Sequence, residues 1–223
     1  MRAITPADDE VFGLANVAAK LGRVDKVLAR IADDHRADPD DPDAACRYAL
    51  ALMATVRADI AAHARFTSAI DAFGRVLAVA PQHWLARYSR ARLRALVPST
   101  YGSLSVHAPS ELAKAAEDLA VLVAAQADQP PQPYFASAYA LAAVVDRLVD
   151  GDSTGGRSAH LAALDGCPRR PVRLPALGAI LCEPLVTLYA GGGPQAARIG
   201  ELMAALYGDQ SAVVDALRRQ PVG

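Results

Sequence analysis

One segment of the chain concentrates the side chains best suited to hold an acidic group. It runs from Gln82 to Arg94 and contains the only tryptophan of the sequence, one tyrosine and four arginines. Arg87, Arg90 and Arg94 are three and four positions apart, so on a helix they share one face. Arginine binds carboxylates through a planar fork of N–H donors. The segment therefore has the chemistry of a carboxylate-binding surface, or else of a solvated arginine stripe beside a row of core aromatics.

Within this segment two assignments differ. We interpret Arg87, Arg90 and Arg94 as the solvated stripe. Tyr88 and Arg92 are four positions apart, so they project from one side of the same helix and could hold a partner together. For this second pair a binding role and a structural role both stay open.

A second group of aromatic side chains follows Pro130. Phe135 and Tyr139 are spaced four positions apart, which is typical of core packing between adjacent helices. Tyr134 stands near the start of the same helix and on a different side of it. We take Tyr134 as the binding candidate of this group, with core packing as the alternative.

No arrangement typical of catalysis or metal binding accompanies these residues. The five histidines never occur four positions apart, and no HExxH, P-loop, GxGxxG or GxSxG pattern is present. Cys182 adjoins Glu183, but no third group stands nearby to orient such a pair, so Cys182 is expected to be a small core residue. The sequence predicts no catalytic residue, no cofactor and no bound metal.

Composition limits the class of protein further. Of the 223 residues 52% are hydrophobic and only 5% are aromatic, and the net charge is -1. This charge gives no reason to expect nucleic acid or a membrane surface as a partner. The three cysteines have no metal or redox spacing, and the first residues lack the apolar core of a secretion signal. We expect a bacterial, cytoplasmic protein.

The elements that must position these side chains are predicted to be helices. A trio of apolar or small residues at offsets of three and four recurs along the chain, and each trio occupies one helix face. The three copies are Val24, Val27 and Ile31; Phe66, Ala69 and Phe73; and Leu112, Ala115 and Leu119. The middle members, at positions 27, 69 and 115, are separated by 42 and 46 residues, which is a spacing of helical repeats.

Two stretches resemble the tetratricopeptide repeat. Residues 22–31 followed by Pro39, and residues 67–81 ending at Pro81, are similar to that family's turn, second helix and terminal proline. The spacing exceeds the period of about 34 residues usual in the family, and the extra residues fall in turns predicted at 59–65 and 98–109. The resemblance covers residues 8–150.

The resemblance implies an all-α fold, a right-handed superhelical stack of antiparallel helix pairs whose first helices line a concave groove. It places Tyr88 and Arg92 on the groove side of a first helix. Residues 1–150 would then form the repeats. Residues 151–223 would form atypical capping helices, including an apolar helix over 174–190, a helix ending at Tyr207 and a short helix over 210–219, all on the same continuous solenoid.

Three functions fit these features. The first is a non-enzymatic scaffold or adaptor that binds a protein or peptide, with an acidic partner favoured by Arg92. The second is a small-molecule-binding protein or enzyme with a pocket between helices, for which Tyr88, Arg92, His83 or Glu183 would supply polar groups. The third is a homo-oligomer formed through the apolar helix at 174–190. The first is favoured, and the sequence leaves catalysis open.

Overall fold

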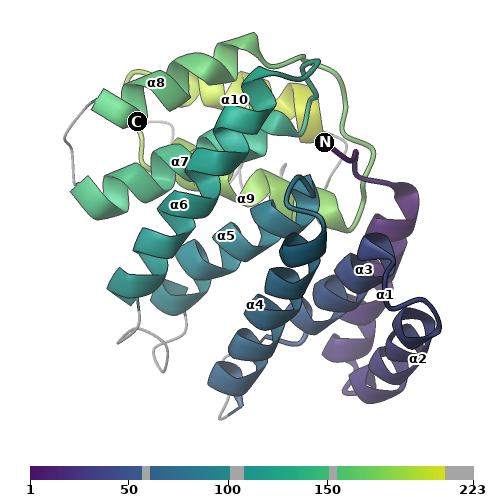
Figure 1. Ribbon diagram of the computed structural model, residues 1–223. Coiled ribbons are helices and arrows are strands. Elements are labelled where there is room, and N and C mark those ends of the chain that lie inside the picture. Colours follow the sequence, from purple (N-terminus) through teal and green to yellow (C-terminus); the bar gives the residue numbers. More distant parts are fainter. Residues whose placement is uncertain (57–60, 101–107, 151–154, 209–223) are drawn as a thin grey trace. The chain divides into compact units, whose positions relative to one another are not determined.

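The regular structure of the chain is helical. The computed structural model describes residues 1–56, 61–100, 108–150 and 155–208, and within these ranges it contains ten α-helices, one short 3-10 helix and no strand (Figure 1). The α-helices are α1 (Pro6–Lys20), α2 (Val24–Ala37), α3 (Pro42–Met53), α4 (Ala62–Val79), α5 (Trp84–Thr100), α6 (Ala108–Ala127), α7 (Phe135–Asp150), α8 (Gly155–Ala163), α9 (Leu177–Ala190) and α10 (Ala196–Tyr207). The 3-10 helix η2 (Leu164–Gly166) follows α8. The prediction of an all-α fold is confirmed for this part of the chain.

Local sequence sets the starts of the first helices. Thr5 caps α1 in a capping box with Asp8, because each side chain bonds the other residue's backbone N–H. Asp41 caps α3 by accepting from the N–H groups of the second and third helical residues. The turn between α1 and α2 needs a left-handed residue, which Gly22 supplies with φ of 68°.

The recurring trio marks the inward face of α2, α4 and α6. Phe66, Ala69 and Phe73 are buried in α4, and Ala115 and Leu119 are buried in α6. In α2 only Ile31 of the trio is fully buried, at 6% exposure. The three predicted faces therefore do point into the core.

The chain divides into two compact units, residues 1–122 and 123–223. In the first unit consecutive helices pack against each other from α1 to α5, and α3 also contacts both α1 and α5. Ala49 in α3 and Ala91 in α5 are 0% exposed, as expected for small residues where helices approach closely. The division falls inside α6, whereas the sequence pattern changes near residue 150; the single continuous solenoid stays a prediction.

The second unit is built around α7 and α9. Helix α7 packs on α8, η2 and α9, and α9 packs on α10. Pro184 lies inside α9 without splitting it, so residues 177–190 form one helix. The leucines of α9 are buried in this unit's own core, namely Leu177, Leu181, Leu185 and Leu188. The chain itself covers the apolar residues that suggested an oligomer, and the oligomer stays a prediction.

Two predicted turns are shorter than expected. Helix α5 continues to Thr100 and α6 begins at Ala108, so only residues 101–107 of the predicted turn at 98–109 lie outside the described helices. Pro98 stands in the last turn of α5, where its missing N–H removes a single helical bond. Similarly, α4 begins at Ala62 within the turn predicted at 59–65. The helix predicted over 210–219 lies outside the described residues.

None of the helices in the described ranges is long and apolar enough to cross a membrane.

Candidate functional site

The structure places the two predicted binding residues of α5 in different environments. Tyr88 is 0% exposed, and its ring stacks on that of Trp84 with centroids 4.9 Å apart and planes 11° from parallel. This ring belongs to the core of the first unit and does not line an open groove. Arg92, one turn later, is half-buried, and its role in binding stays a prediction.

Tyr134 belongs to the second unit, directly before α7. Its side chain is half-buried, and its ring meets that of Phe135 edge to face, with centroids 5.3 Å apart. This contact is the packing alternative of the sequence analysis. The binding role of Tyr134 stays a prediction.

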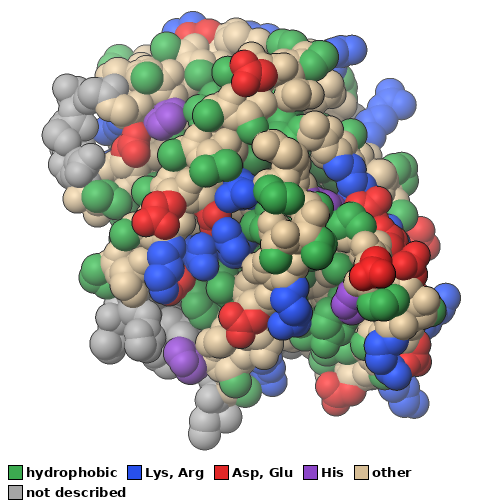
Figure 2. Space-filling model, in the orientation of Figure 1, with side chains coloured by type: hydrophobic (Ala, Val, Ile, Leu, Met, Phe, Trp, Pro, Cys, Tyr) green, Lys and Arg blue, Asp and Glu red, His purple; other side chains and the backbone are tan. Residues whose placement is uncertain are grey.

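A cleft of about 310 Å³ opens between α2, α3 and α4 in the first unit. Figure 2 shows hydrophobic side chains between α4 and α2 on this face of the molecule. The lining residues come from the end of α2 and the turn after it, from α3 and from the outer face of α4. They are His35, Pro39, Ala45, Tyr48, Ala72, Arg75, Ala78 and Val79. We call this space the α2–α4 cleft.

The α2–α4 cleft combines aromatic, apolar and cationic surface. The rings of His35 and Tyr48 are stacked, with centroids 5.9 Å apart. Val79 is 68% exposed, which makes it the most exposed large hydrophobic side chain of the described residues. Arg75 is exposed, and no ion pair or hydrogen bond joins it to another described residue. Buried Nδ1 of His35 also lacks a hydrogen-bond partner there. Such a surface can hold an extended segment that carries an apolar side chain and a carboxylate.

The arginine stripe of α5 is not solvated as the sequence suggested. Arg87, Arg90 and Arg94 converge on the carboxylate of Asp118 in α6, and we call these four residues the arginine cluster. Their arginine side chains are only 14%, 17% and 15% exposed, and that of Asp118 is 4% exposed. Figure 2 shows the cationic side chains gathered over α5 and α6, with acidic ones among them.

Both oxygens of Asp118 are saturated by guanidinium donors. Oδ1 accepts from Arg87 at 3.1 Å and from Arg90 at 2.5 Å. Oδ2 accepts from Arg90 at 2.9 Å and from Arg94 at 2.8 Å. The sequence pattern did not identify Asp118 as this acceptor, although it contains a signal for one. Glu111 and Asp118 are seven positions apart on α6, which matches the seven positions from Arg87 to Arg94 on α5.

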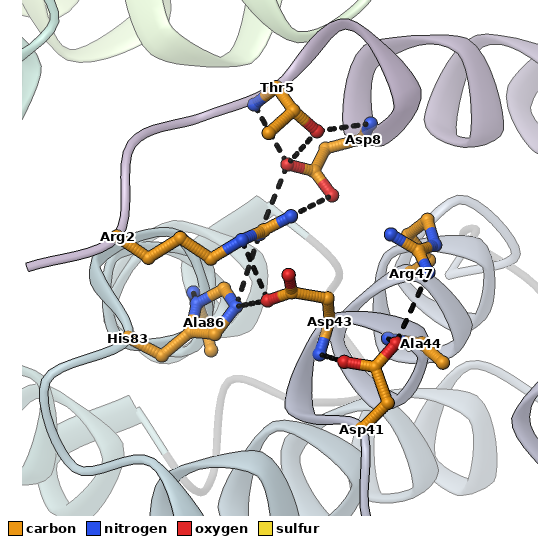
Figure 3. A network of polar contacts seen from close by, with 9 residues as sticks. All are labelled: Arg2, Thr5, Asp8, Asp41, Asp43, Ala44, Arg47, His83 and Ala86. Carbon is orange, nitrogen blue, oxygen red and sulfur yellow. Dashed lines mark hydrogen bonds and ion pairs between the residues drawn. The ribbon is translucent and has the colours of Figure 1, made fainter. Parts of the chain in front are cut away.

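A second polar network joins the starts of α1, α3 and α5 (Figure 3). Arg2 lies at its centre: Nε is 2.7 Å from Oδ1 of Asp43, and Nη1 is 3.2 Å from Oδ2 of Asp8. Asp8 is 0% exposed and also accepts from the backbone and hydroxyl of Thr5. The segment before α1 is therefore tied to α3 by a partly buried ion pair, in which the side chains of Arg2 and Asp43 are 23% and 33% exposed.

His83 completes this network and is fully engaged within it. Nδ1 accepts the backbone N–H of Ala86. Nε2 lies 3.3 Å from Oδ1 of Asp43 and 3.3 Å from Nη1 of Arg2. Burial lowers the pKa of His83 below its ordinary value, and Arg2 lowers it further, while Asp43 and Asp8 act in the opposite direction. Nδ1 therefore caps α5, and Nε2 faces both Asp43 and Arg2.

The cysteines have the character of core residues. Cys46, Cys167 and Cys182 are all buried and unpaired with one another. Burial raises the pKa of the Cys167 thiol to about 11 and that of Cys182 to about 12. Within the described ranges no group of three or more His, Cys, Asp or Glu side chains is arranged to hold a metal ion, and the absence of a metal stays a prediction.

Comparison of the chain with protein-family models, with curated proteins and with solved structures finds no match.

Proposed function

We propose that the protein is a binding module that holds an extended segment of a partner protein in the α2–α4 cleft. The observation that carries this proposal is the cleft itself. It is open to solvent, and it joins the exposed side chain of Val79 to a stacked aromatic pair. It also has at its edge an arginine, Arg75, that pairs with no other described residue. The partner segment presents an apolar side chain to Val79 and Tyr48 and a carboxylate to Arg75.

We further propose that the first six helices form three antiparallel pairs of the tetratricopeptide kind. Two observations support this arrangement. The first helices α1, α3 and α5 contact one another in sequence, and the recurring trio faces inward on α4 and α6. In such a stack a partner contacts surfaces formed by successive pairs, and the α2–α4 cleft spans the first and second pairs.

Selection from a random peptide library displayed on phage tests the binding function. Peptides recovered on the wild-type protein are synthesised, and their affinities are measured by fluorescence polarisation. We expect the Val79→Glu variant to bind them about tenfold more weakly or worse, because the change places a charge in the apolar part of the cleft. We expect Arg75→Gln to weaken those peptides that carry a carboxylate by a similar factor.

Val149→Glu is the matched control. Val149 is 54% exposed and lies on α7 in the second unit, so the same change occurs at a comparable surface position outside the cleft. This variant is expected to bind like the wild type. If Val79→Glu and Val149→Glu bind the selected peptides equally well, or if no peptide is enriched, the α2–α4 cleft is not the binding surface.

A further inference from the structure

The arginine cluster carries more positive charge than its acidic partners neutralise. Besides Asp118, it contacts one further carboxylate, since Nε of Arg94 lies 3.4 Å from Oε2 of Glu111. Glu111 is shared with Lys114, whose Nζ is 2.7 Å from Oε1. The group therefore joins four cations to two carboxylates, an excess of two positive charges among the described residues.

The side chain of Lys114 is 50% exposed, but the three arginines lie where water screens their charge poorly. Each of the three arginine side chains is at most 17% exposed. Burial lowers the pKa of Arg87; Asp118 opposes this effect, and Arg90 adds to it by repulsion. Charges of one sign held together in a weakly solvated place repel each other and favour a bound anion.

Some guanidinium N–H groups of the cluster have no acceptor among the described residues, and these donors indicate a site for a second anion beside Asp118. Arg87 uses Nη1 for Asp118 and Nη2 for the carbonyl of Pro81. No described residue accepts from Nη1 of Arg90 or from Nη2 of Arg94. The two arginines are four positions apart on α5, so their guanidinium groups lie one helical turn apart. Gly74 of α4 carries no side chain beside the first of these nitrogens; a Cβ there would lie 3.7 Å from Nη1 of Arg90, an ordinary van der Waals distance.

We propose that the arginine cluster binds a phosphate group, with Arg90 and Arg94 as its main donors. A phosphate monoester carries about −1.5 to −2 charges near pH 7, which matches the excess of the cluster, whereas a single carboxylate neutralises half of it. Three acceptor oxygens suit donors from two neighbouring guanidinium groups. The group can be free inorganic phosphate or part of a phosphorylated side chain.

This site is separate from the α2–α4 cleft. None of the residues that line the cleft belongs to the arginine cluster, and the proposal does not rest on the proposed function. Failure of peptide selection on the cleft would not contradict the phosphate site. Absence of phosphate binding would likewise not contradict peptide binding in the cleft.

The test is titration calorimetry at constant ionic strength with three probes: inorganic phosphate, a phosphoserine peptide and the same peptide with serine. We expect saturable binding of both phosphate-bearing probes and none of the serine peptide. Tighter binding of the phosphoserine peptide than of inorganic phosphate assigns the site to a modified partner, and equal or tighter binding of inorganic phosphate assigns it to the free ion. Absence of saturable phosphate binding overturns the proposal.

Variants distinguish phosphate binding at this site from nonspecific attraction of phosphate to surface cations. Arg90→Gln is expected to weaken phosphate binding about tenfold, since it removes one charged donor. Arg36→Gln removes the same charge on α2, where the side chain is 71% exposed, and is expected to bind like the wild type. Equal affinities of these two variants would also overturn the proposal.

A third variant keeps the test valid if Arg90→Gln does not fold. Asp118→Asn keeps an acceptor oxygen but removes the internal negative charge that competes for the arginines. We expect it to bind inorganic phosphate several-fold more tightly than the wild type. Thermal denaturation gives a second readout. The melting temperature in phosphate is compared with that in sodium chloride of equal ionic strength. Phosphate should raise it more for Asp118→Asn than for the wild type. Unchanged or weaker binding by Asp118→Asn contradicts a phosphate site at this position.

Discussion

Nε2 of His83 lies 3.3 Å from Oδ1 of Asp43, and the same carboxylate oxygen lies 2.7 Å from Nε of Arg2. The imidazole and the guanidinium thus lie beside the same carboxylate, while Nδ1 of the ring caps α5. The groups that face this ring are Arg2 from the segment before α1, Asp8 from α1, Asp43 from α3 and the backbone N–H of Ala86 from α5. The start of α5 therefore depends on the protonation state of one histidine.

The first prediction concerns the pH dependence of stability. The folded pKa of His83 is lowered below the ordinary value of about 6.5, so the unfolded chain binds a proton first as the pH falls. The contribution of His83 to stability is complete above pH 6.5 and is lost as the pH falls from there through the folded pKa. Urea denaturation followed by circular dichroism between pH 5 and pH 7.5 measures this loss.

His83→Asn is the control for that measurement. Asparagine is a good N-cap and does not titrate, so it retains the cap of α5 and removes the proton uptake. The free energy of unfolding should depend less on pH in this variant than in the wild type over the same range. An identical pH dependence would assign the effect to other titratable groups.

The second prediction concerns Arg2. Arg2→Ala removes both ion pairs of the residue and leaves the carboxylate of Asp8, which is 0% exposed, with Thr5 as its remaining partner. We expect a loss of about 1–3 kcal/mol in the free energy of unfolding. Arg36→Ala, at an exposed ion pair with Asp33, should change it by no more than about 0.5 kcal/mol. Equal effects of the two changes, measured by urea denaturation, would show that the network around Arg2 adds no stability.

Much of the fold follows from sequence pattern, because its signals are local. The spacing of Phe66, Ala69 and Phe73 acts within two helical turns, and the structure confirms that these residues share a buried face. The cap of α1 at Thr5 is equally local. The predicted turn at 98–109 was too long because α5 continues past Pro98, and because Pro109 lies in the first turn of α6, where a helix tolerates proline.

The candidate sites depend on contacts between helices that pattern alone does not specify. Arg87 and Arg90 both pair with Asp118, which is 31 and 28 positions away in the sequence. The α2–α4 cleft likewise brings together His35 and Arg75, which come from different helices. Tyr88 shows the same limit. Its position on one helix face was clear, but whether that face, which Tyr88 shares with Trp84, met solvent or the core depended on neighbouring helices.

The third prediction concerns thiol reactivity. The thiolate is the reacting form, and burial raises the pKa of all three cysteines, so an aromatic disulfide reagent should react slowly with the native protein at pH 8. Cys167 should react first because it is 7% exposed, whereas Cys46 and Cys182 are 0% and 1% exposed. Mass spectrometry of partly labelled protein identifies the order. Complete labelling in denaturant serves as the control, and fast labelling of Cys46 in the native protein would contradict its burial.

The fourth prediction isolates backbone strain in the turn that joins α1 to α2. Gly22 has φ of 68°, and a Cβ added there meets nothing within 4 Å. Gly22→Ala is therefore strained only by the left-handed backbone, which costs about 1–2 kcal/mol for a residue with a side chain. Gly166→Ala is a matched change, since its Cβ also meets nothing within 4 Å and its φ is not positive. Urea denaturation should show a loss of about 1 kcal/mol or more for Gly22→Ala and no loss for Gly166→Ala. Gly22→Asn should lose less than Gly22→Ala, because asparagine tolerates the left-handed region better than alanine does. If all three variants are as stable as the wild type, the turn between α1 and α2 does not require a left-handed residue at position 22.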